Sequence, residues 1–209
     1  MATANYDLLN AFLAADNHHH PINSGPAGPD PEQAIVRRIS MKKTDKMLEF
    51  FFTVPKATGP LPTGGIRALV EELRGLPIVD TGTESPLDLN VKAPSYVVFM
   101  LSKDWDWKFF PDAKAVSLKK RDHGDRYGGL RHVPDMGEPS IDAVNNCRMI
   151  YFVAHPLPEN MGNAPQQGYG HGFNLYVDLA QPPNPDTGAA RVLKIIIDPD
   201  IRNPGGSED

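Results

Sequence analysis

The strongest constraint on the fold comes from two apolar runs near the end of the chain, at residues 173–179 and 191–197. Apolar and polar residues alternate in the first run, which is the period-two pattern of a half-buried strand. The second run is rich in β-branched residues, which favour strands. The connection between them, residues 181–188, is rich in proline, asparagine and glycine and is too short to hold a covering helix. Two strands joined in this way are predicted to form an antiparallel pair.

Other apolar runs of strand length recur along the chain, at residues 34–41, 47–54, 96–101, 105–110, 115–118 and 147–154. The first two flank a short polar turn, which predicts a hairpin. Residues 122–127 and 137–146 are polar and are expected to be loops. Because the strands do not alternate regularly with helices, a doubly wound parallel sheet is disfavoured. The pattern predicts a mainly β protein, an antiparallel β-sandwich of jelly-roll type.

Two short peripheral helices are expected, over about residues 5–15 and 64–74. The apolar residues of the second helix recur at i, i+3, i+4 and i+7 and form one stripe, made up of Ile66, Leu69, Val70 and Leu73. Thr63 precedes this helix and is expected to be its N-cap. Gly75 stands where a left-handed residue commonly ends a helix.

Length and composition favour one domain. Residues 33–200 are assigned to the sandwich, residues 1–32 to the first helix and a loop rich in proline, glycine and histidine, and residues 201–209 to a flexible tail. A chain of 209 residues can bury roughly 70% of its unfolded surface without disulfide or metal support. The 18 glycines and 21 prolines together make up nearly a fifth of the chain, against a usual combined share of about 12%. This excess indicates long loops.

Composition also bounds the partners and the compartment. The net charge is −5 and no segment is densely basic, which argues against nucleic acid as a partner. No apolar run approaches the ~20 residues that cross a bilayer, and the first residues lack the pattern of a signal peptide, so no membrane partner is expected. The single cysteine, Cys147, begins a strongly apolar run and is expected to be a buried thiol in a reducing compartment. A cytoplasmic location is predicted.

One set of residues suggests a metal site. His123 and Asp125 form a His-x-Asp pair, and His171 lies at the start of a predicted strand, with His155 as a second choice for the distant ligand. This set resembles the facial triad of the 2-oxoglutarate-dependent oxygenases, and it implies Fe(II), or another divalent metal, held by His123, Asp125 and His171. The arginine that those enzymes carry about ten residues beyond the distal histidine is missing, and the next arginine is Arg191.

A second set suggests carbohydrate binding. Aspartates and tryptophans alternate in the segment Asp104-Trp105-Asp106-Trp107. Tryptophan faces can stack on sugars, and paired carboxylates can serve sugar chemistry or bind calcium. Aspartates at strand ends more often stabilise turns, so a structural role for Asp104 and Asp106 is the alternative.

The chain contains no complete catalytic motif, such as the nucleophile elbow Gly-x-Ser-x-Gly. The sequence therefore favours a protein that acts by binding or assembly, with a protein partner or a small ligand. The iron-dependent oxygenase and the carbohydrate-binding module remain alternatives. A homo-oligomer is also expected, formed through the helix at residues 5–15 or through an edge strand such as 47–54 or 96–101.

Overall fold

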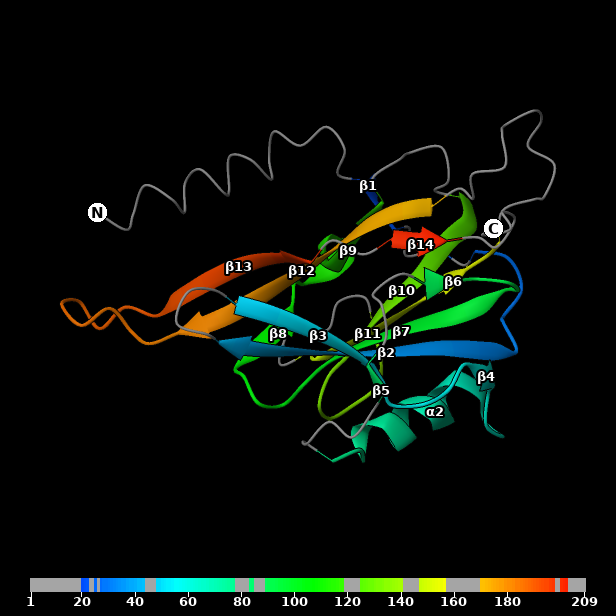
Figure 1. Cartoon of the computed structure of the whole chain (residues 1–209), viewed down its shortest axis with the longest axis horizontal. Coiled ribbons are helices and arrows are strands. Elements are labelled where there is room, and N and C mark those ends of the chain that lie inside the picture. Colours follow the sequence, from blue (N-terminus) through cyan, green and yellow to red (C-terminus); the bar gives the residue numbers. More distant parts are fainter. Residues whose placement is uncertain are drawn as a thin grey trace.

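The computed structural model describes residues 20–22, 25, 27–43, 48–77, 83–84, 89–118, 125–140, 147–156, 170–197 and 200–202. The helix expected at residues 5–15 lies outside the described residues, and so do residues 44–46 of the hairpin turn expected near 43–46. The described chain is mainly β and forms a two-sheet sandwich with one short α-helix, as predicted (Figure 1).

The first sheet contains seven strands in the order β10-β11-β7-β2-β3-β5, with β4 paired to β2. Their bounds are β2 Gln33–Lys43, β3 Leu48–Val54, β4 Gly59–Pro60, β5 Thr83–Glu84, β7 Ser95–Leu101, β10 Tyr127–Val133 and β11 Met149–Ala154. The predicted hairpin is confirmed, because β2 and β3 pair antiparallel with Ile39 opposite Phe52.

The second sheet is organised around the long strand β12. It runs in the order β1-β9-β12-β14-β6, and β8 and β13 also pair with β12. Its strands are β1 His20–Pro21, β6 Leu89–Asn90, β8 Trp107–Phe109, β9 Val116–Leu118, β12 Gly170–Gln181, β13 Arg191–Ile197 and β14 Asp200–Arg202. A short 3-10 helix, η1 Asp112–Ala115, leads into β9. The antiparallel pair predicted from the final apolar runs is confirmed as β12 and β13.

Two strand pairs depart from the expected antiparallel arrangement. β2 and β7 pair in parallel, with Gln33 opposite Ser95, and β14 pairs in parallel with β6. The chain returns from β3 through β4 and the helix before β7 joins the other side of β2. The sandwich is therefore mixed, and the jelly-roll topology stays a prediction.

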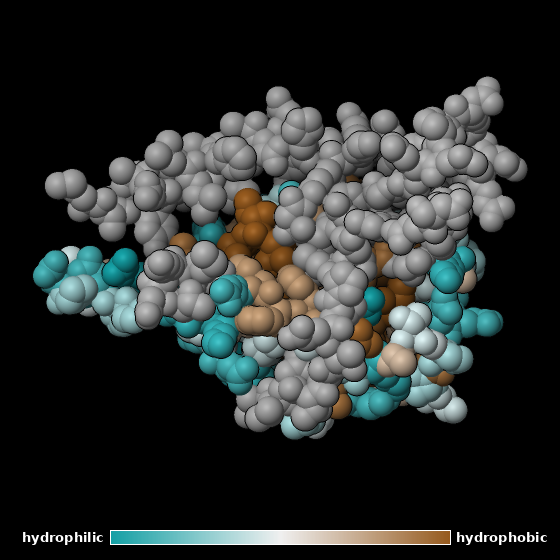
Figure 2. All heavy atoms as spheres, viewed as in Figure 1, coloured by the Kyte–Doolittle hydropathy of each residue, from teal (hydrophilic) through white to brown (hydrophobic). Residues whose placement is uncertain are grey.

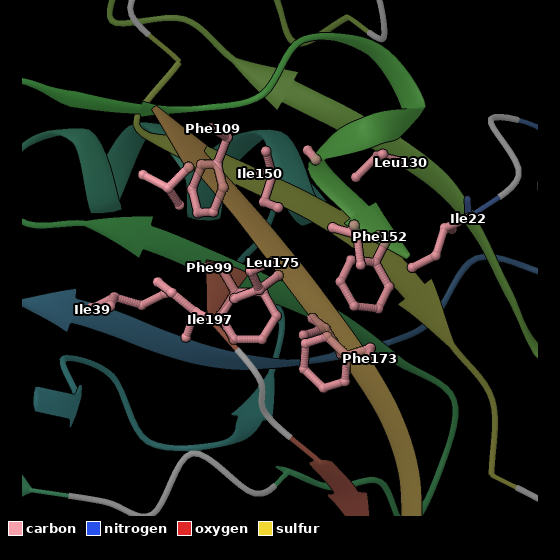
Figure 3. Packing of buried hydrophobic residues seen from close by; sticks show 14 of the residues in the cluster. Ile22, Ile39, Phe99, Phe109, Leu130, Ile150, Phe152, Phe173, Leu175 and Ile197 are labelled. Carbon is pink, nitrogen blue, oxygen red and sulfur yellow. The ribbon is translucent and has the colours of Figure 1, made fainter. Parts of the chain in front are cut away.

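The space between the two sheets is filled by one continuous apolar cluster. Phe99 of β7, Phe152 of β11 and Phe173 of β12 meet there, with ring centroids 5.6 to 6.4 Å apart (Figure 3). Alternate residues of β12 face this core and are almost completely buried, namely Phe173, Leu175, Val177 and Leu179. The period-two pattern in the sequence thus follows from the direction of alternate side chains into this core.

A second apolar cluster lies on the outer face of the first sheet, under the helix α2, Gly65–Arg74 (Figure 1). The predicted stripe is confirmed, since Leu69, Val70 and Leu73 are each 1% exposed. They pack with buried residues of the strands, including Val36 and Val98.

The ends of α2 differ from expectation. Gly64, and not Thr63, is the N-cap; its φ is 101°, a left-handed conformation that favours glycine, and no side chain caps the helix. Gly75 has a φ of −75° and is right-handed, so the predicted left-handed end is wrong. Its backbone N–H instead donates to carbonyls of the last turn.

The strand β10 was not predicted, because Gly128 and Gly129 interrupt its pattern and glycine has low strand propensity. The register of β10 against β11 shifts between Gly128 and Arg131, and Gly129 has a φ of 67°. A Cβ on Gly128 would lie 2.6 Å from the carbonyl oxygen of Gly25. The two glycines are therefore required by the bulge and by the close approach of another backbone segment.

Candidate functional site

The predicted iron ligands are not brought together within the described residues. His123 lies outside them, and for His171 only the backbone is described, in β12 opposite Ile201. The carboxylate of Asp125 is 75% exposed and lies 3.7 Å from Nε of Arg126. His155, the second choice, is hydrogen-bonded through Nε2 to the carbonyl of Ala27. No group of three or more His, Cys, Asp or Glu side chains that could hold a metal occurs among the described residues, so the iron site stays a prediction.

The two tryptophans do not form a shared platform for a sugar. Trp107 is 2% exposed in the core, and its Nε1 donates to the carbonyl of Ser102 at 2.7 Å. Trp105 is half-buried against the same core, and its Nε1 donates to the carbonyl of Met41 at 2.6 Å. The stacking role is wrong for Trp107, because β8 directs this ring between the sheets. Asp104 and Asp106 are exposed beside it.

Cys147 is a buried thiol, as predicted, and is 1% exposed. Burial, together with the nearby Asp135, raises the pKa of this thiol above its ordinary value. A thiol with a raised pKa holds its proton at neutral pH and is a poor nucleophile.

A group of charged residues that the sequence did not single out lies on the outer face of the second sheet. Asp178 of β12 stands opposite Lys108 of β8 on one side and Lys194 of β13 on the other. Side chains directly opposite each other on one face are about 5 Å apart at Cβ, so both ammonium groups can reach the carboxylate. We call Lys108, Asp178, Lys194 and the adjoining ring of Phe110 the outer-face cluster.

Contacts within the outer-face cluster hold its members in a half-buried setting. Nζ of Lys194 lies 3.9 Å from Oδ1 of Asp178 and 4.4 Å from the centroid of the Phe110 ring. The side chains of Lys194 and Asp178 are 33% and 20% exposed. Oδ1 of Asp178 is buried and has no hydrogen-bond partner among the described residues. The cluster thus has two cations, one carboxylate and unused hydrogen-bonding capacity.

The charge balance at Asp178 is set by burial. Burial raises the pKa of the Asp178 carboxyl, and the lysines at positions 194 and 108 oppose this effect without cancelling it. A buried carboxylate is disfavoured unless it is well paired, and here the nearer cation is at the outer limit of an ion pair. A titratable group whose pKa is shifted by burial and by specific neighbouring charges often marks a functional site.

A polar strip continues from the outer-face cluster along β12. The hydroxyls of Tyr176 and Ser117 share a hydrogen bond of 2.9 Å between β12 and β9. Nδ2 of Asn174 donates to the Tyr176 hydroxyl at 3.5 Å, and the Tyr176 ring lies 5.7 Å from that of Phe110. From Asn174 to Asp178 the strip is about 13 Å long, at ~3.3 Å per strand residue.

A shallow hollow of about 300 Å³ lies on the opposite side of the molecule, beside the first turns of α2. It is lined by Gly64, Arg67, Ala68, Val70, Glu71, Glu138 and Pro139. Arg67 and Glu138 form a weak ion pair of 3.8 Å across it, and both are more than three-quarters exposed. With two carboxylates and one arginine, this hollow holds less positive charge than the outer-face cluster.

The sequence contains only weak indications of the outer-face cluster. Lys194 interrupts an apolar strand, and Asp178 is a charged residue in a strand whose other face is buried. Lys108 lies in a run with alternating charge between two aromatic residues. These signals do not reveal that three strands place the residues side by side, because the pairing of β8 with β12 joins distant parts of the chain.

The comparisons with known proteins bear on the same region. No helix among the described residues is long and apolar enough to cross a membrane. No curated protein matches the sequence. A family described as "Predicted novel nucleotide synthetase" matches residues 71–206, which include every member of the outer-face cluster. Because this match covers more than half of the chain, the protein belongs to the family of predicted novel nucleotide synthetases, pNTSase1.

Proposed function

We propose that this protein acts by binding a nucleotide, whose phosphate groups lie at the outer-face cluster between Lys108 and Lys194. The observation that carries the proposal is the pair of lysines on either side of one poorly paired carboxylate. An ammonium group is a point charge with three donors and is well suited to phosphate oxygens. The description of the family supports the same class of ligand.

The proposal is one of binding, and it rests on the charged side chains of the outer-face cluster. The half-buried amide of Asn174, at the end of the polar strip, offers a further hydrogen-bonding group for the remainder of the ligand. A cytoplasmic location and the absence of a nucleic-acid partner, both expected from composition, are part of the proposal.

Calorimetric titration with ATP as the probe tests the proposal. Lys108→Met and Lys194→Met are each expected to weaken binding by about tenfold or more, since hydrogen bonds to charged groups contribute about 1.5–3 kcal/mol. Methionine keeps the aliphatic stem and removes the charge.

The matched control is the double variant Lys42→Met/Lys92→Met, which removes two exposed positive charges elsewhere. Comparison with Lys108→Met/Lys194→Met separates a local site from a change in net charge. Equal losses of ATP affinity in the two double variants would contradict the proposal. No binding of ATP to the wild type at millimolar concentration would contradict it as well.

Self-assembly is a second candidate function, favoured by the edge of the second sheet. Among the described strands β13 pairs only with β12, and Val192 near its start is 40% exposed. Figure 2 shows apolar surface where β13 and β3 lie, and a hydrophilic tip on the β12–β13 hairpin. An open edge of this kind can add a strand from a second copy.

Light scattering coupled to size-exclusion chromatography tests assembly. Val192→Lys adds a charge to the edge strand and is expected to shift a wild-type oligomer toward monomer. A wild type that stays monomeric at high concentration would exclude this candidate function.

A further inference from the structure

We infer that Asp178 is a built-in counter-ion that a bound phosphate replaces at the two lysines, so that ligand binding is accompanied by uptake of a proton at Asp178. This inference rests on the proposed function and deepens it, because it assigns the site a dependence on charge and pH. Three observations lead to it: the position of Asp178, the weakness of its contacts, and the charges that face it.

The position of Asp178 makes a phosphate and the carboxylate compete for the same groups. Lys108 and Lys194 flank Asp178 in register on β8 and β13, so an anion that reaches both ammonium groups lies beside the carboxylate. At 20% exposure the Asp178 side chain has little water to screen it from a second negative charge. Two close anions in such a setting do not both stay ionised, and the carboxylate then holds a proton.

The contacts of Asp178 are weak enough to be replaced. The distance from Lys194 Nζ to Oδ1 is 3.9 Å, which is longer than a hydrogen bond. The same Nζ lies over the Phe110 ring, a cation–π contact that does not satisfy its hydrogen-bond donors. A phosphate oxygen offers this ammonium a shorter, charge-assisted hydrogen bond.

Among the residues that the structure describes, the charges that act on Asp178 come from two lysines. Lys194 and Lys108 act on it from the two adjacent strands, and on β12 itself the neighbours on the same face are Tyr176 and Ala180. In the free protein, burial raises the pKa of the Asp178 carboxyl, and the two lysines partly oppose this rise. When a phosphate neutralises the lysines, their opposing effect is lost, so the pKa rises further and a proton is bound.

Affinity should therefore weaken as pH rises from the pKa that Asp178 has in the free protein to the higher pKa that it has in the complex, because binding must take a proton from the solvent over that range. The phosphate of the ligand titrates as well, with a pKa near 6. The contribution of Asp178 is isolated by comparison with a variant that cannot titrate, measured with the same ligand.

The experiment measures the binding of ATP to the wild type and to Asp178→Asn, in two buffers of different ionisation enthalpy at the same pH. The dependence of the binding heat on the buffer gives the number of protons taken up. We expect the wild type to take up more protons than Asp178→Asn. We expect the variant to bind ATP about two- to fivefold more tightly at neutral pH, the size of a partly exposed charge interaction.

Equal proton uptake by the two proteins would overturn the inference, and so would weaker binding by Asp178→Asn. Either result, with binding still lost in Lys108→Met/Lys194→Met, would leave the proposed function standing. No binding of ATP by the wild type would overturn both. Circular dichroism checks that the variant is folded, and Asp178→Ser replaces it if the asparagine variant does not fold.

Discussion

The two outer faces of the sandwich are built from the same kind of strand and carry different side chains. On the first sheet the outer face is apolar, and α2 buries it through Leu69, Val70 and Leu73. On the second sheet the outer face carries the polar strip and the outer-face cluster. The difference fits the proposed function, in which the first face maintains the fold and the half-buried charges of the second face bind the ligand.

The largest effect is expected where α2 covers the first sheet. Leu73 is 1% exposed, and Leu73→Ala is expected to lower the free energy of unfolding by about 2–5 kcal/mol, because a cavity replaces buried methyl groups. Urea unfolding measures this change. Arg67→Ala on the exposed side of the same helix is the control and should stay within about 0.5 kcal/mol of wild type. A loss below about 1 kcal/mol for Leu73→Ala would show that the helix contributes little to stability.

A smaller effect is expected in the polar strip. Tyr176 and Ser117 are 1% and 0% exposed and share a hydrogen bond. Tyr176→Phe is expected to cost about 1–3 kcal/mol in unfolding free energy, because the buried Ser117 hydroxyl loses this partner. The double variant Tyr176→Phe/Ser117→Ala should lose less than the sum of the single losses. Additive losses would mean that the two hydroxyls do not depend on each other.

A still smaller effect on stability is expected at the outer-face cluster. Lys194→Met removes one partly exposed charge and keeps the aliphatic contact with Phe110. The free energy of unfolding should stay within about 1 kcal/mol of wild type. A loss above about 2 kcal/mol would assign Lys194 to the stability of the sheet and weaken the contrast between the two faces.

The pH dependence of stability gives the finest comparison. Burial raises the folded-state pKa of Asp178 above its ordinary value of 3.8. A raised pKa contributes stability that is complete below the unfolded value and is lost as pH rises through the folded value. The stability of Asp178→Asn relative to wild type should therefore increase from acidic to neutral pH. Urea unfolding at the two pH values measures the trend, and the opposite trend would contradict a buried, poorly paired carboxylate.

Much of the fold could be predicted because it depends on local patterns. The alternation in residues 173–179 and the stripe in residues 64–74 follow directly from which side of each element is buried. β10 could not be found in this way, since Gly128 and Gly129 serve a bulge and a close backbone contact. The N-cap was misplaced by one residue because a left-handed glycine can begin a helix without a side-chain bond.

The candidate site was harder to predict than the fold. Lys108, Asp178 and Lys194 acquire a shared role only when β8 and β13 pair with β12 in one particular register. The residue types that attracted attention, the histidines and tryptophans, are informative only if their side chains converge or are exposed. Trp107 is buried instead, because the alternation of β8 directs it into the core.

The parallel pairing of β2 with β7 also determines the order in which this chain can fold. Gln33 and Ser95, which face each other at the start of that pair, are 62 positions apart. During synthesis the β2–β3 hairpin can form early. The backbone groups on the other edge of β2 stay unpaired until β7 has left the ribosome. The half-made chain therefore exposes an apolar strand edge for that interval, and this is when we expect it to depend most on protection from aggregation.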